Sequence, residues 1–437
     1  MRGGGRTAAV LLAAVAMVVA ALAPAAAQQQ PKGNDIGITN SEIRVAVVAD
    51  VDNPVVPGLF KSGVDAVQAW AKTVNQQGGI AGRKVVVDFI DSKLSPNEAR
   101  NALITACGQD FALVGTEALF ITNVSDLETC KNAQGQPVGI PDLSGIATSA
   151  ERCSPVTYYL NSDAAYCATK SDHPQTYTAQ QGDYRYYVKT NKDLHGIWLA
   201  PADVKDVENA TLPSYQAGMD LGIKPDGEGV YDVFARDPQS ALTPKIQVVK
   251  QNGSTFLYNG SSAAMMILAR REAKLQGANS VKLWACHQGC YDHDWLVQGG
   301  SDVEGTHSML LNLPFYTEYK SSPPLASLAK TLGGPDKVNS YGVSALIAAL
   351  MFQDAARKAV AGGGTLTRQS LFDALKNTHD FDAQGLVGPV DIGNHATPHC
   401  IVVTVVKDGK WVREYPKKAG TFDCSTKNVA TVKRDAT

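Results

Sequence analysis

Short apolar runs and helical repeats alternate along the first part of the chain. The apolar runs at residues 43–49 and 85–90 predict buried strands. Between them, apolar residues recur every three to four positions over residues 64–74, which predicts a helix. A connection of this length can cross over, so the two strands are expected to be parallel. Because ligands bind beyond the carboxyl ends of strands in open parallel sheets, we expect function at the loops that open at Asp50 and Asp91.

The alternation continues with one interruption. In the first part, helices are predicted at residues 96–106 and 123–131, and strands at residues 111–114 and 138–140. The pattern breaks at residues 158–163. It then restarts with strands at residues 196–200, 230–234, 255–258 and 281–285 and helices at residues 210–221, 242–252 and 263–276. The sequence therefore predicts an α/β fold with two similar, Rossmann-like halves, each built on a parallel central sheet.

The last third of the chain adds a strand, a long helix and a hairpin. A strand is predicted at residues 309–313 and an amphipathic helix at residues 343–360. Two further β segments, at residues 400–406 and 410–415, are separated by Lys407, Asp408 and Gly409. An Asp-Gly pair between two apolar runs is a strong signal for a β-hairpin.

The first 27 residues are typical of a secretory signal. Arg2 and Arg6 precede an apolar core at residues 8–22, and alanines at residues 25–27 form a cleavage site. The alternative is a membrane anchor, because residues 7–30 carry no charge and could nearly span a bilayer. The small-residue site and the high alanine content favour cleavage. We therefore expect an exported protein, located in a periplasm or in the extracellular or cell-wall space.

Size and charge restrict the class of protein further. A chain of 437 residues is longer than a single hydrophobic core usually accommodates, which indicates two domains. Lys and Arg total 40 against 42 Asp and Glu, and the two signs are mixed along the chain. No basic block is present, which argues against a nucleic-acid partner.

The order and spacing of residues 43–91 carry a family resemblance. An apolar strand, a loop, a helix and a glycine-rich stop lead into a second strand that ends at an aspartate. This order resembles the periplasmic branched-chain-amino-acid-type binding proteins of ABC transporters. The matching residues are Asn75, Gly78, Gly79, Ile80, Gly82, Arg83 and Asp91. Residues 243–276, Tyr341 with its helix, and the hairpin at residues 407–411 also resemble the family, although Gly342 stands where an aspartate is usual.

The resemblance implies a type I periplasmic binding fold with two lobes and a three-segment hinge. The chain is expected to cross between the lobes near Leu160, Asn312 and Gln384. The first lobe would comprise residues 28–160 and 313–384, and the second residues 161–312 and 385–437. Proteins of this kind close on a small organic ligand and deliver it to the membrane permease of an ABC transporter. A monomer without cofactor or enzymatic activity is expected.

All eight cysteines lie after the predicted signal. An even count in an exported protein indicates disulfides. Pairing of nearest neighbours is the simplest arrangement: Cys107 with Cys130, Cys153 with Cys167, Cys286 with Cys290, and Cys400 with Cys424. The first of these pairs resembles a disulfide found in several members of the family.

Candidate ligand-binding residues of the first lobe follow its predicted strands. Backbone N–H groups at loops and helix N-termini can hold a ligand carboxylate. The candidates are Thr116, Leu119, Phe120, Ser144, Ala147 and Thr148. The alternative for Thr116 and Thr148 is helix capping. Leu119 and Phe120 replace small hydroxyl residues of the family, which favours an aromatic or branched acid or its amide; alternatively, they begin a helix and face the core.

The second lobe would contribute residues from its own strand ends. Asp203 is a candidate partner for a ligand ammonium group, with a solvated loop as the alternative. Ser261 follows a predicted strand, and Tyr316 could form an aromatic wall of the cleft or pack in the core. Asp50 and Asp52 show no evident partner and are assigned to a surface loop.

Three functions remain open at this point. The first is ligand capture for an ABC importer, with the ligand an amino acid, an amide, or an aromatic or branched acid. The second is a sensor that presents the same closed clamp to a receptor. The third is a secreted zinc enzyme, because residues 286–293 contain two cysteines and two histidines. Their spacing fits no standard zinc site, so a local disulfide without metal is expected there.

Overall fold

The computed structural model describes residue 1 and residues 35–160, 177–203 and 205–432. The predicted signal and Cys167 lie outside the described residues. Among the helices of the described part, none combines the length and the apolar character that a membrane span requires.

The first sheet contains five parallel strands in the order β2-β1-β3-β4-β5. Pairing of Ile43 with Val85 confirms the parallel pair that the first two apolar runs predict. The strands are β1 (Glu42–Ala49), β2 (Lys84–Asp91), β3 (Ala112–Glu117), β4 (Asp142–Ile146) and β5 (Thr157–Tyr159). We call this sheet and the helices that pack on it the first lobe.

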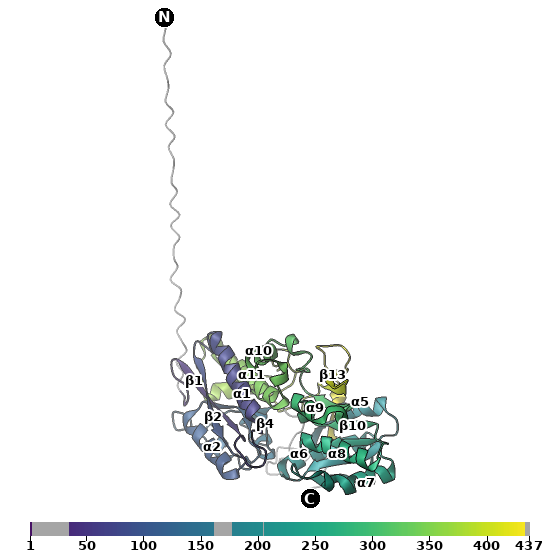
Figure 1. Cartoon of the computed structure of the whole chain (residues 1–437). Coiled ribbons are helices and arrows are strands. Elements are labelled where there is room, and N and C mark those ends of the chain that lie inside the picture. Colours follow the sequence, from purple (N-terminus) through teal and green to yellow (C-terminus); the bar gives the residue numbers. More distant parts are fainter. Residues whose placement is uncertain (2–34, 161–176, 204, 433–437) are drawn as a thin grey trace. The chain divides into compact units, whose positions relative to one another are not determined.

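Helices from distant parts of the chain cover the first sheet (Figure 1). The long helix α11 packs against β3, β4 and α1, although it follows β3 by more than two hundred residues. Its buried side is almost entirely apolar, which explains why it returns to this sheet. The helices of this lobe are α1 (Lys61–Gln76), α2 (Pro96–Gln109), α3 (Ser125–Glu128), α4 (Ser149–Arg152), α10 (Pro323–Leu332), α11 (Ser340–Val360) and α12 (Arg368–Lys376).

The second sheet contains seven strands in the order β13-β12-β11-β10-β9-β7-β8. The strands β7, β8, β9, β10 and β11 run parallel to one another. The strand β12 pairs antiparallel with β11 on one side and with β13 on the other, and β12 and β13 form the predicted hairpin. The strands are β7 (His195–Pro201), β8 (Lys224–Val233), β9 (Phe256–Asn259), β10 (Leu283–Cys286), β11 (Thr306–Leu310), β12 (Val402–Lys407) and β13 (Lys410–Tyr415). This sheet and its helices form the second lobe.

The helices of the second lobe follow the predicted alternation closely. Gly253 and Gly277 take the left-handed conformation directly after α7 and α8, as helix stops do. A small antiparallel pair, β6 (Tyr177–Gln180) and β14 (Val429–Val432), lies beside this lobe's helix α6. The helices are α5 (Gly182–Thr190), α6 (Lys205–Asp220), α7 (Thr243–Asn252), α8 (Ala263–Gln276) and α9 (His293–Gly299). The predicted α/β fold with parallel central sheets is confirmed.

Two predictions for the first lobe are wrong. Residues 138–140 form no strand, and the strand lies instead at β4, in a segment that was assigned to a ligand loop. The polar start of β4 is stable inside the lobe because hydroxyls of Thr116 and Thr157 donate to the buried Asp142 carboxylate at 2.6 and 2.9 Å. The helix predicted at residues 123–131 shrinks to the single turn α3.

Two of the predicted crossings lie side by side. Asn312 and Val387 form an antiparallel bridge, and the N–H of Leu313 donates to the carbonyl oxygen of Leu386 at 2.9 Å. A shared bridge of this kind lets the two segments bend together. The exact lobe boundaries stay a prediction.

Three of the predicted cysteine pairs lie at disulfide distance. They are Cys107–Cys130, Cys286–Cys290 and Cys400–Cys424. Cys153 is also disulfide-bonded, and its predicted partner lies outside the described residues.

Candidate functional site

Each sheet contains one point where the strand order reverses. In the first sheet β2 lies on one side of β1 and β3 on the other, so the reversal falls between β1 and β3. In the second sheet β7 lies between β8 and β9, so the reversal falls between β7 and β9. Open α/β sheets bind ligands beyond the carboxyl ends of the strands at such switch points. The residues around these two points therefore form the candidate site.

Asp50 and Asp91 shape the loops at the first switch point. The Asp50 carboxylate is fully buried and accepts hydrogen bonds from Ser92 Oγ at 2.6 Å and from the backbone N–H groups of Leu94 and Leu119 at 2.7 and 2.8 Å. Asp91 accepts three further N–H groups from the same loops. The assignment of Asp50 to a surface loop without partners is wrong. Both carboxylates are used to hold the loops.

Glu117 is the last residue of β3 and lies at the first switch point. Its carbonyl oxygen accepts the N–H of Asp50 at 3.0 Å, which ties it to the end of β1. The side chain is completely buried, and neither carboxyl oxygen has a hydrogen-bond partner among the described residues. Burial raises the pKa of Glu117 well above its ordinary value, because a buried charge loses its hydration. Burial therefore favours the uncharged form of this carboxyl.

Two glycines make the space that the Glu117 carboxyl occupies. A Cβ atom at Gly63 in α1 would lie 2.1 Å from Oε2, and one at Gly145 in β4 would lie 2.8 Å from Oε1. Tyr341, at the start of α11, is close enough that the Glu117 carboxyl contributes to raising the pKa of its hydroxyl to about 12, after burial. The Tyr341 ring meets the Phe60 ring edge to face, with 5.0 Å between the ring centroids.

The second switch point contains an unpartnered hydroxyl. Asn259, at the end of β9, accepts the N–H of Ser261 at 3.2 Å and donates to the carbonyl oxygen of Ser262 at 3.0 Å, which fixes the turn. The Ser261 hydroxyl oxygen is buried and has no hydrogen-bond partner among the described residues. On the other side of the switch point, the exposed Asp203 accepts the N–H of Ala235 with both oxygens, at 2.8 and 3.0 Å. Asp203 therefore braces a loop in this structure.

His287 follows the neighbouring strand β10 and also lacks a partner at one nitrogen. Its Nδ1 accepts the N–H of Gly289 at 3.1 Å, so the neutral ring carries its proton on Nε2. Nε2 is buried, without a hydrogen-bond partner in the described part of the chain. Burial lowers the pKa of His287 to about 4, which keeps the ring uncharged. The Cys286–Cys290 disulfide closes the turn that presents it.

The two lobes touch beside these groups. The Ser340 hydroxyl, at the start of α11, donates to the carbonyl oxygen of Gln288 at 2.7 Å. A Cβ at Gly289 would lie 3.2 Å from the Tyr341 hydroxyl. Tyr341 is therefore close both to Glu117 in the first lobe and to the His287 turn in the second.

Arg236 makes a second contact between the lobes. It follows β8, and its guanidinium donates from Nε to the carbonyl oxygen of Val55 at 2.5 Å and also to the carbonyl oxygen of Pro54. Pro54 and Val55 belong to the loop that leads from β1 to α1. Arg236 thus bridges the outer parts of the two switch-point loops.

The predicted hydroxyl residues of the first lobe donate their protons inside it. Thr116 donates to Asp142 at 2.6 Å, Ser144 to the carbonyl oxygen of Thr116 at 3.1 Å, and Thr148 to the carbonyl oxygen of Ile121 at 2.7 Å. Thr148 also caps α4 in a capping box, the alternative that the sequence left open. These oxygens retain only acceptor capacity for a ligand.

The other predicted residues occupy three different positions. Ala147 is buried, with its carbonyl oxygen accepting Arg152 Nε at 3.0 Å. Leu119 and Phe120 are half-buried in a turn after β3 and begin no helix. Tyr316 stacks on Tyr291, and its hydroxyl donates to the carbonyl oxygen of Val338 at 3.0 Å. Ser261 is thus the predicted hydroxyl residue whose oxygen lacks a partner among the described residues.

One cluster of the described residues has the composition of a metal site. The ligand atoms of Cys286, His287 and Cys290 all lie within 4.8 Å of one another. The two sulfur atoms, however, are bonded to each other, and a disulfide offers no thiolate to a zinc ion. His293, the fourth residue of the zinc hypothesis, is not part of this cluster.

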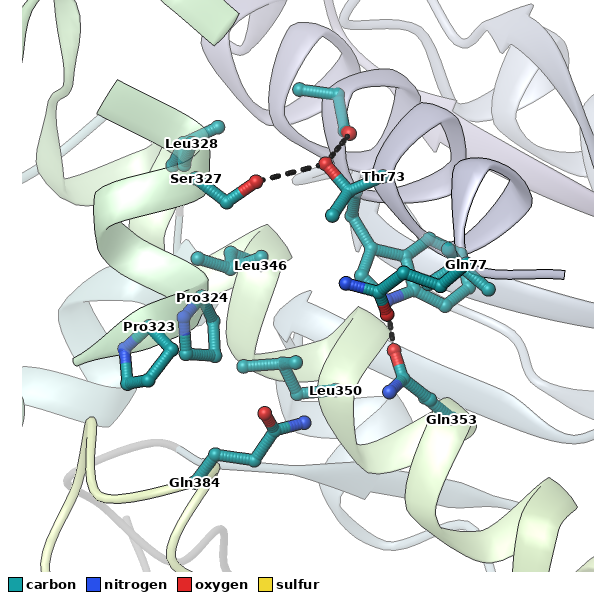
Figure 2. A pocket seen from close by; sticks show the side chains of 13 residues that line it. Thr73, Gln77, Pro323, Pro324, Ser327, Leu328, Leu346, Leu350, Gln353 and Gln384 are labelled. Carbon is teal, nitrogen blue, oxygen red and sulfur yellow. Dashed lines mark hydrogen bonds between the residues drawn. The ribbon is translucent and has the colours of Figure 1, made fainter. Parts of the chain in front are cut away.

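A cavity of about 130 Å³ lies away from the switch points, between α1, α10 and α11 (Figure 2). The second half of α1 forms part of its lining and is hydrogen-bonded to the other two helices. Thr73 Oγ1 lies 2.9 Å from Ser327 Oγ in α10, and Trp70 donates to Gln353 Oε1 in α11 at 2.7 Å. An adjoining cavity of about 180 Å³ shares Gln353 and Gln384 with it. Neither cavity touches the unpartnered groups at the strand ends.

Sequence reasoning named the loops of the site but missed its central side chains. Glu117 lies between Thr116 and Leu119, which the sequence analysis names as candidates, but it is not itself among the predicted residues. The available signal was a lone carboxylate that closes a buried apolar strand at a switch point. The burial of His287 and the Arg236 bridge had no signal in the sequence, because both depend on contacts between the lobes.

Two open parallel sheets with connected switch points define a two-lobe α/β ligand-binding protein. The chain belongs to the periplasmic binding protein family, whose sequence profile matches residues 42–188 and 214–410. The resemblance found in the sequence and the type I periplasmic binding fold are thereby confirmed. No curated protein matches the sequence.

Solved structures share this fold at low sequence identity. A fatty acid ABC transporter substrate-binding protein from Thermomonospora curvata is 18% identical, with a TM-score of 0.66 over 90% of this chain and 98% of that one. A branched-chain amino acid ABC transporter protein from Thermus thermophilus with bound valine is 13% identical, with a TM-score of 0.66 over 89% and 98%. A leucine-binding protein from Thermotoga maritima is 15% identical, with a TM-score of 0.60 over 85% and 97%.

Proposed function

We propose that this protein is the extracytoplasmic solute-binding subunit of an ABC importer, which captures one small organic ligand between its lobes. The observation that carries the proposal is the set of buried polar groups without partners at the strand ends of both sheets: Glu117, Ser261 and His287. Buried polar groups are nearly always hydrogen-bonded, so such a set indicates a missing ligand or water. Membership of a family of binding proteins supports the same function.

The mechanism would be hinge closure without chemistry on the ligand. The paired segments at Asn312 and Val387 supply a bend between the lobes, with the first lobe at residues 28–160 and 313–384 and the second at residues 161–312 and 385–437. A ligand that contacts both lobes binds the closed form better and shifts the population toward it. The closed monomer, exported by the signal at its start, would then dock on the membrane permease.

We infer the ligand class from the apolar side chains near the first switch point and from the predicted aromatic wall. Leu119, Phe120 and Tyr316 favour a ligand with an apolar skeleton, together with the Phe60–Tyr341 pair. The similar structures are named for fatty acid, leucine and valine ligands, which share an apolar chain and a polar head. We therefore propose a branched or aromatic acid, its amide, or an apolar amino acid.

A thermal-shift screen of the mature protein tests this function. The panel contains amino acids, short amides, branched and aromatic acids, and fatty acids. Ligand at 100 times its dissociation constant stabilises the folded state by about 2.7 kcal/mol, which raises the midpoint by several degrees. A saturable shift with one chemical class is expected. Protein shown to be free of ligand that responds to no compound would contradict the proposal.

A further inference from the structure

We propose, on the basis of the function proposed above, that Glu117 sets the ligand specificity of this protein. In this reading it selects an uncharged hydrogen-bonding group, a carboxamide, over an ammonium or a carboxylate. Nothing in the family resemblance assigns a ligand contact to this residue, and neither oxygen of its carboxyl has a hydrogen-bond partner among the described residues.

The placement of the carboxyl argues for a role beyond packing. A glutamate that served only to fill space would be replaced there by an apolar side chain at no cost in hydrogen bonding. Instead, Gly63 and Gly145 leave room for its two oxygens, and a Cβ at either position would collide with them. Both oxygens lie beside the N-terminal ends of α1 and α11, where the first lobe meets the His287 turn of the second.

Among the described residues around Glu117, none supplies a counter-charge to its carboxyl. The elements around it present Gly63, Gly145 and Ala345, and its pKa is raised by burial alone. One titratable group that interacts with Glu117 is the Tyr341 hydroxyl, which burial keeps protonated. Asp292, the other carboxylate that acts on Tyr341, accepts the N–H of Trp295 as the cap of α9. An ionised Glu117 would therefore be a buried charge without a partner, which proteins avoid.

The unpartnered groups described at the strand ends across the site are uncharged as well. They are the Ser261 hydroxyl and the Nε2–H of His287. The carboxylates of Asp50, Asp91 and Asp203 are occupied by backbone N–H groups. None of these described groups offers a free charge to a ligand head, whereas a carboxamide offers a donor pair and an acceptor that match a protonated carboxyl and two neutral donors.

Three probes of one branched skeleton separate the alternatives: isovaleramide is neutral, isoamylamine is cationic and isovalerate is anionic. We expect isovaleramide to raise the thermal midpoint of the wild-type protein and the two ions to leave it unchanged. Glu117→Gln keeps a neutral donor and acceptor, so its dissociation constant for isovaleramide in calorimetry should stay within about threefold of wild type. Glu117→Leu should weaken binding at least tenfold. Glu228→Gln, an exposed site in β8, is the matched control and should bind like wild type.

A pH series gives a second readout that does not depend on the fold of the leucine variant. Ionisation of Glu117 removes its donor, so isovaleramide binding to wild type should weaken as pH rises through the pKa of this carboxyl. Binding to Glu117→Gln should show no such loss. Circular dichroism checks that each variant is folded.

Other outcomes overturn the inference in distinguishable ways. Tighter binding of isoamylamine, abolished in Glu117→Gln, would assign Glu117 to a cation and leave the proposed transport function intact. A saturable ligand from the wider panel whose affinity is the same in all Glu117 variants would remove Glu117 from the site, again without touching the function. Silence of the whole panel with ligand-free protein would contradict the proposed function itself, and the inference with it.

Discussion

At the scale of single residues, Asp50 is the group that should matter most for the shape of the first switch point. Its carboxylate receives three donors from two separate segments, the loop after β2 and the turn after β3, so Asp50→Asn replaces one acceptor oxygen with an NH₂ group that faces a donor. Leaving a buried donor unsatisfied costs about 1–3 kcal/mol. We expect the free energy of unfolding, measured by urea denaturation, to fall by that amount.

Asp52→Asn is the matched control for Asp50→Asn. Asp52 lies two residues away on the same loop, but its side chain is exposed. An exposed substitution of this kind usually changes stability by less than about 0.5 kcal/mol. Equal losses in the two variants would mean that the buried hydrogen bonds of Asp50 do not stabilise the fold.

The sequence indicated these residues only by their position at strand ends. It places Asp50 and Glu117 directly after apolar runs, which is enough to predict a switch-point loop. Whether each carboxyl is buried, satisfied or ionised depends on Ser92, Leu119, Gly63 and the other groups that the fold brings to it. The spacing of apolar residues carries no information on such contacts. For that reason the sequence predicts Asp50 wrongly on a surface loop and does not indicate Glu117 as a site residue.

At the scale of elements, Arg368 joins α12 to the opposite end of the first sheet. Its guanidinium is buried and donates to the backbone carbonyl oxygens at the end of α2, at the start of β3 and in the following loop. Burial lowers the pKa of Arg368 to about 10, so it stays charged at neutral pH. Positive charge at the C-terminal end of a helix is also favoured by the helix dipole.

Arg368→Gln should therefore destabilise the first lobe strongly. A glutamine reaches at most two of these carbonyl groups and leaves the others buried without a donor, so we expect a loss of about 3 kcal/mol or more. Arg357→Gln, on the exposed side of α11, is the control. Denaturant unfolding followed by circular dichroism measures both. A loss below 1 kcal/mol for Arg368→Gln would show that water replaces the guanidinium at little cost.

The Arg236 bridge gives a prediction for the contact between the lobes. Arg236→Ala removes the donors to Pro54 and Val55 without disturbing either sheet. Exposed hydrogen bonds contribute about 0.5–1.5 kcal/mol, so the dissociation rate of a bound ligand should rise about two- to tenfold. Stopped-flow competition measures that rate with any ligand found in the screen. Arg271→Ala, which breaks an ion pair within the second lobe, should leave the rate unchanged.

Elements with a strong apolar period were the ones that the sequence predicted well. The helix α8 has the predicted bounds, and α1, α7, β1 and β13 agree within a few residues. The strand β4 was missed because its sequence, Asp-Leu-Ser-Gly-Ile, looks like a loop when taken alone. It forms a strand because Thr116 and Thr157 satisfy Asp142 from the neighbouring strands. That stabilisation is tertiary, so no local pattern reports it.

At the scale of the whole molecule, the two lobes differ in the kind of buried group whose pKa is shifted by burial. In the first lobe, burial raises the pKa of Asp110 to about 7 and that of Glu117 well above its ordinary value. In the second lobe, burial lowers the pKa of His287 and of His307 to about 4. Asp292, near the boundary, has a raised pKa like the acids of the first lobe.

These shifts give the two lobes opposite pH dependence. An acid whose folded pKa is raised contributes stability below its unfolded pKa and loses it as pH rises through the folded value. A histidine whose folded pKa is depressed contributes stability above about pH 6.5 and loses it as pH falls toward 4. Between pH 5 and 8, the first lobe should therefore become less stable as pH rises, and the second lobe more stable. The depressed pKa of Glu414, about 2, acts below this window.

Native-state hydrogen exchange resolves the two lobes within one protein. After correction for intrinsic rates, the opening free energy of amides in β1 and β3 should be higher at pH 5 than at pH 8, and that of amides in β9 and β10 should be lower. Glu117→Gln removes one of the raised acids and should flatten the slope of the first lobe, while the slope of the second lobe stays as it is. A common slope in both sheets would mean that the two lobes unfold only together and would contradict the separate pH dependence predicted for them. Opposite slopes would show that each lobe is a separate cooperative unit whose stability follows its own buried groups.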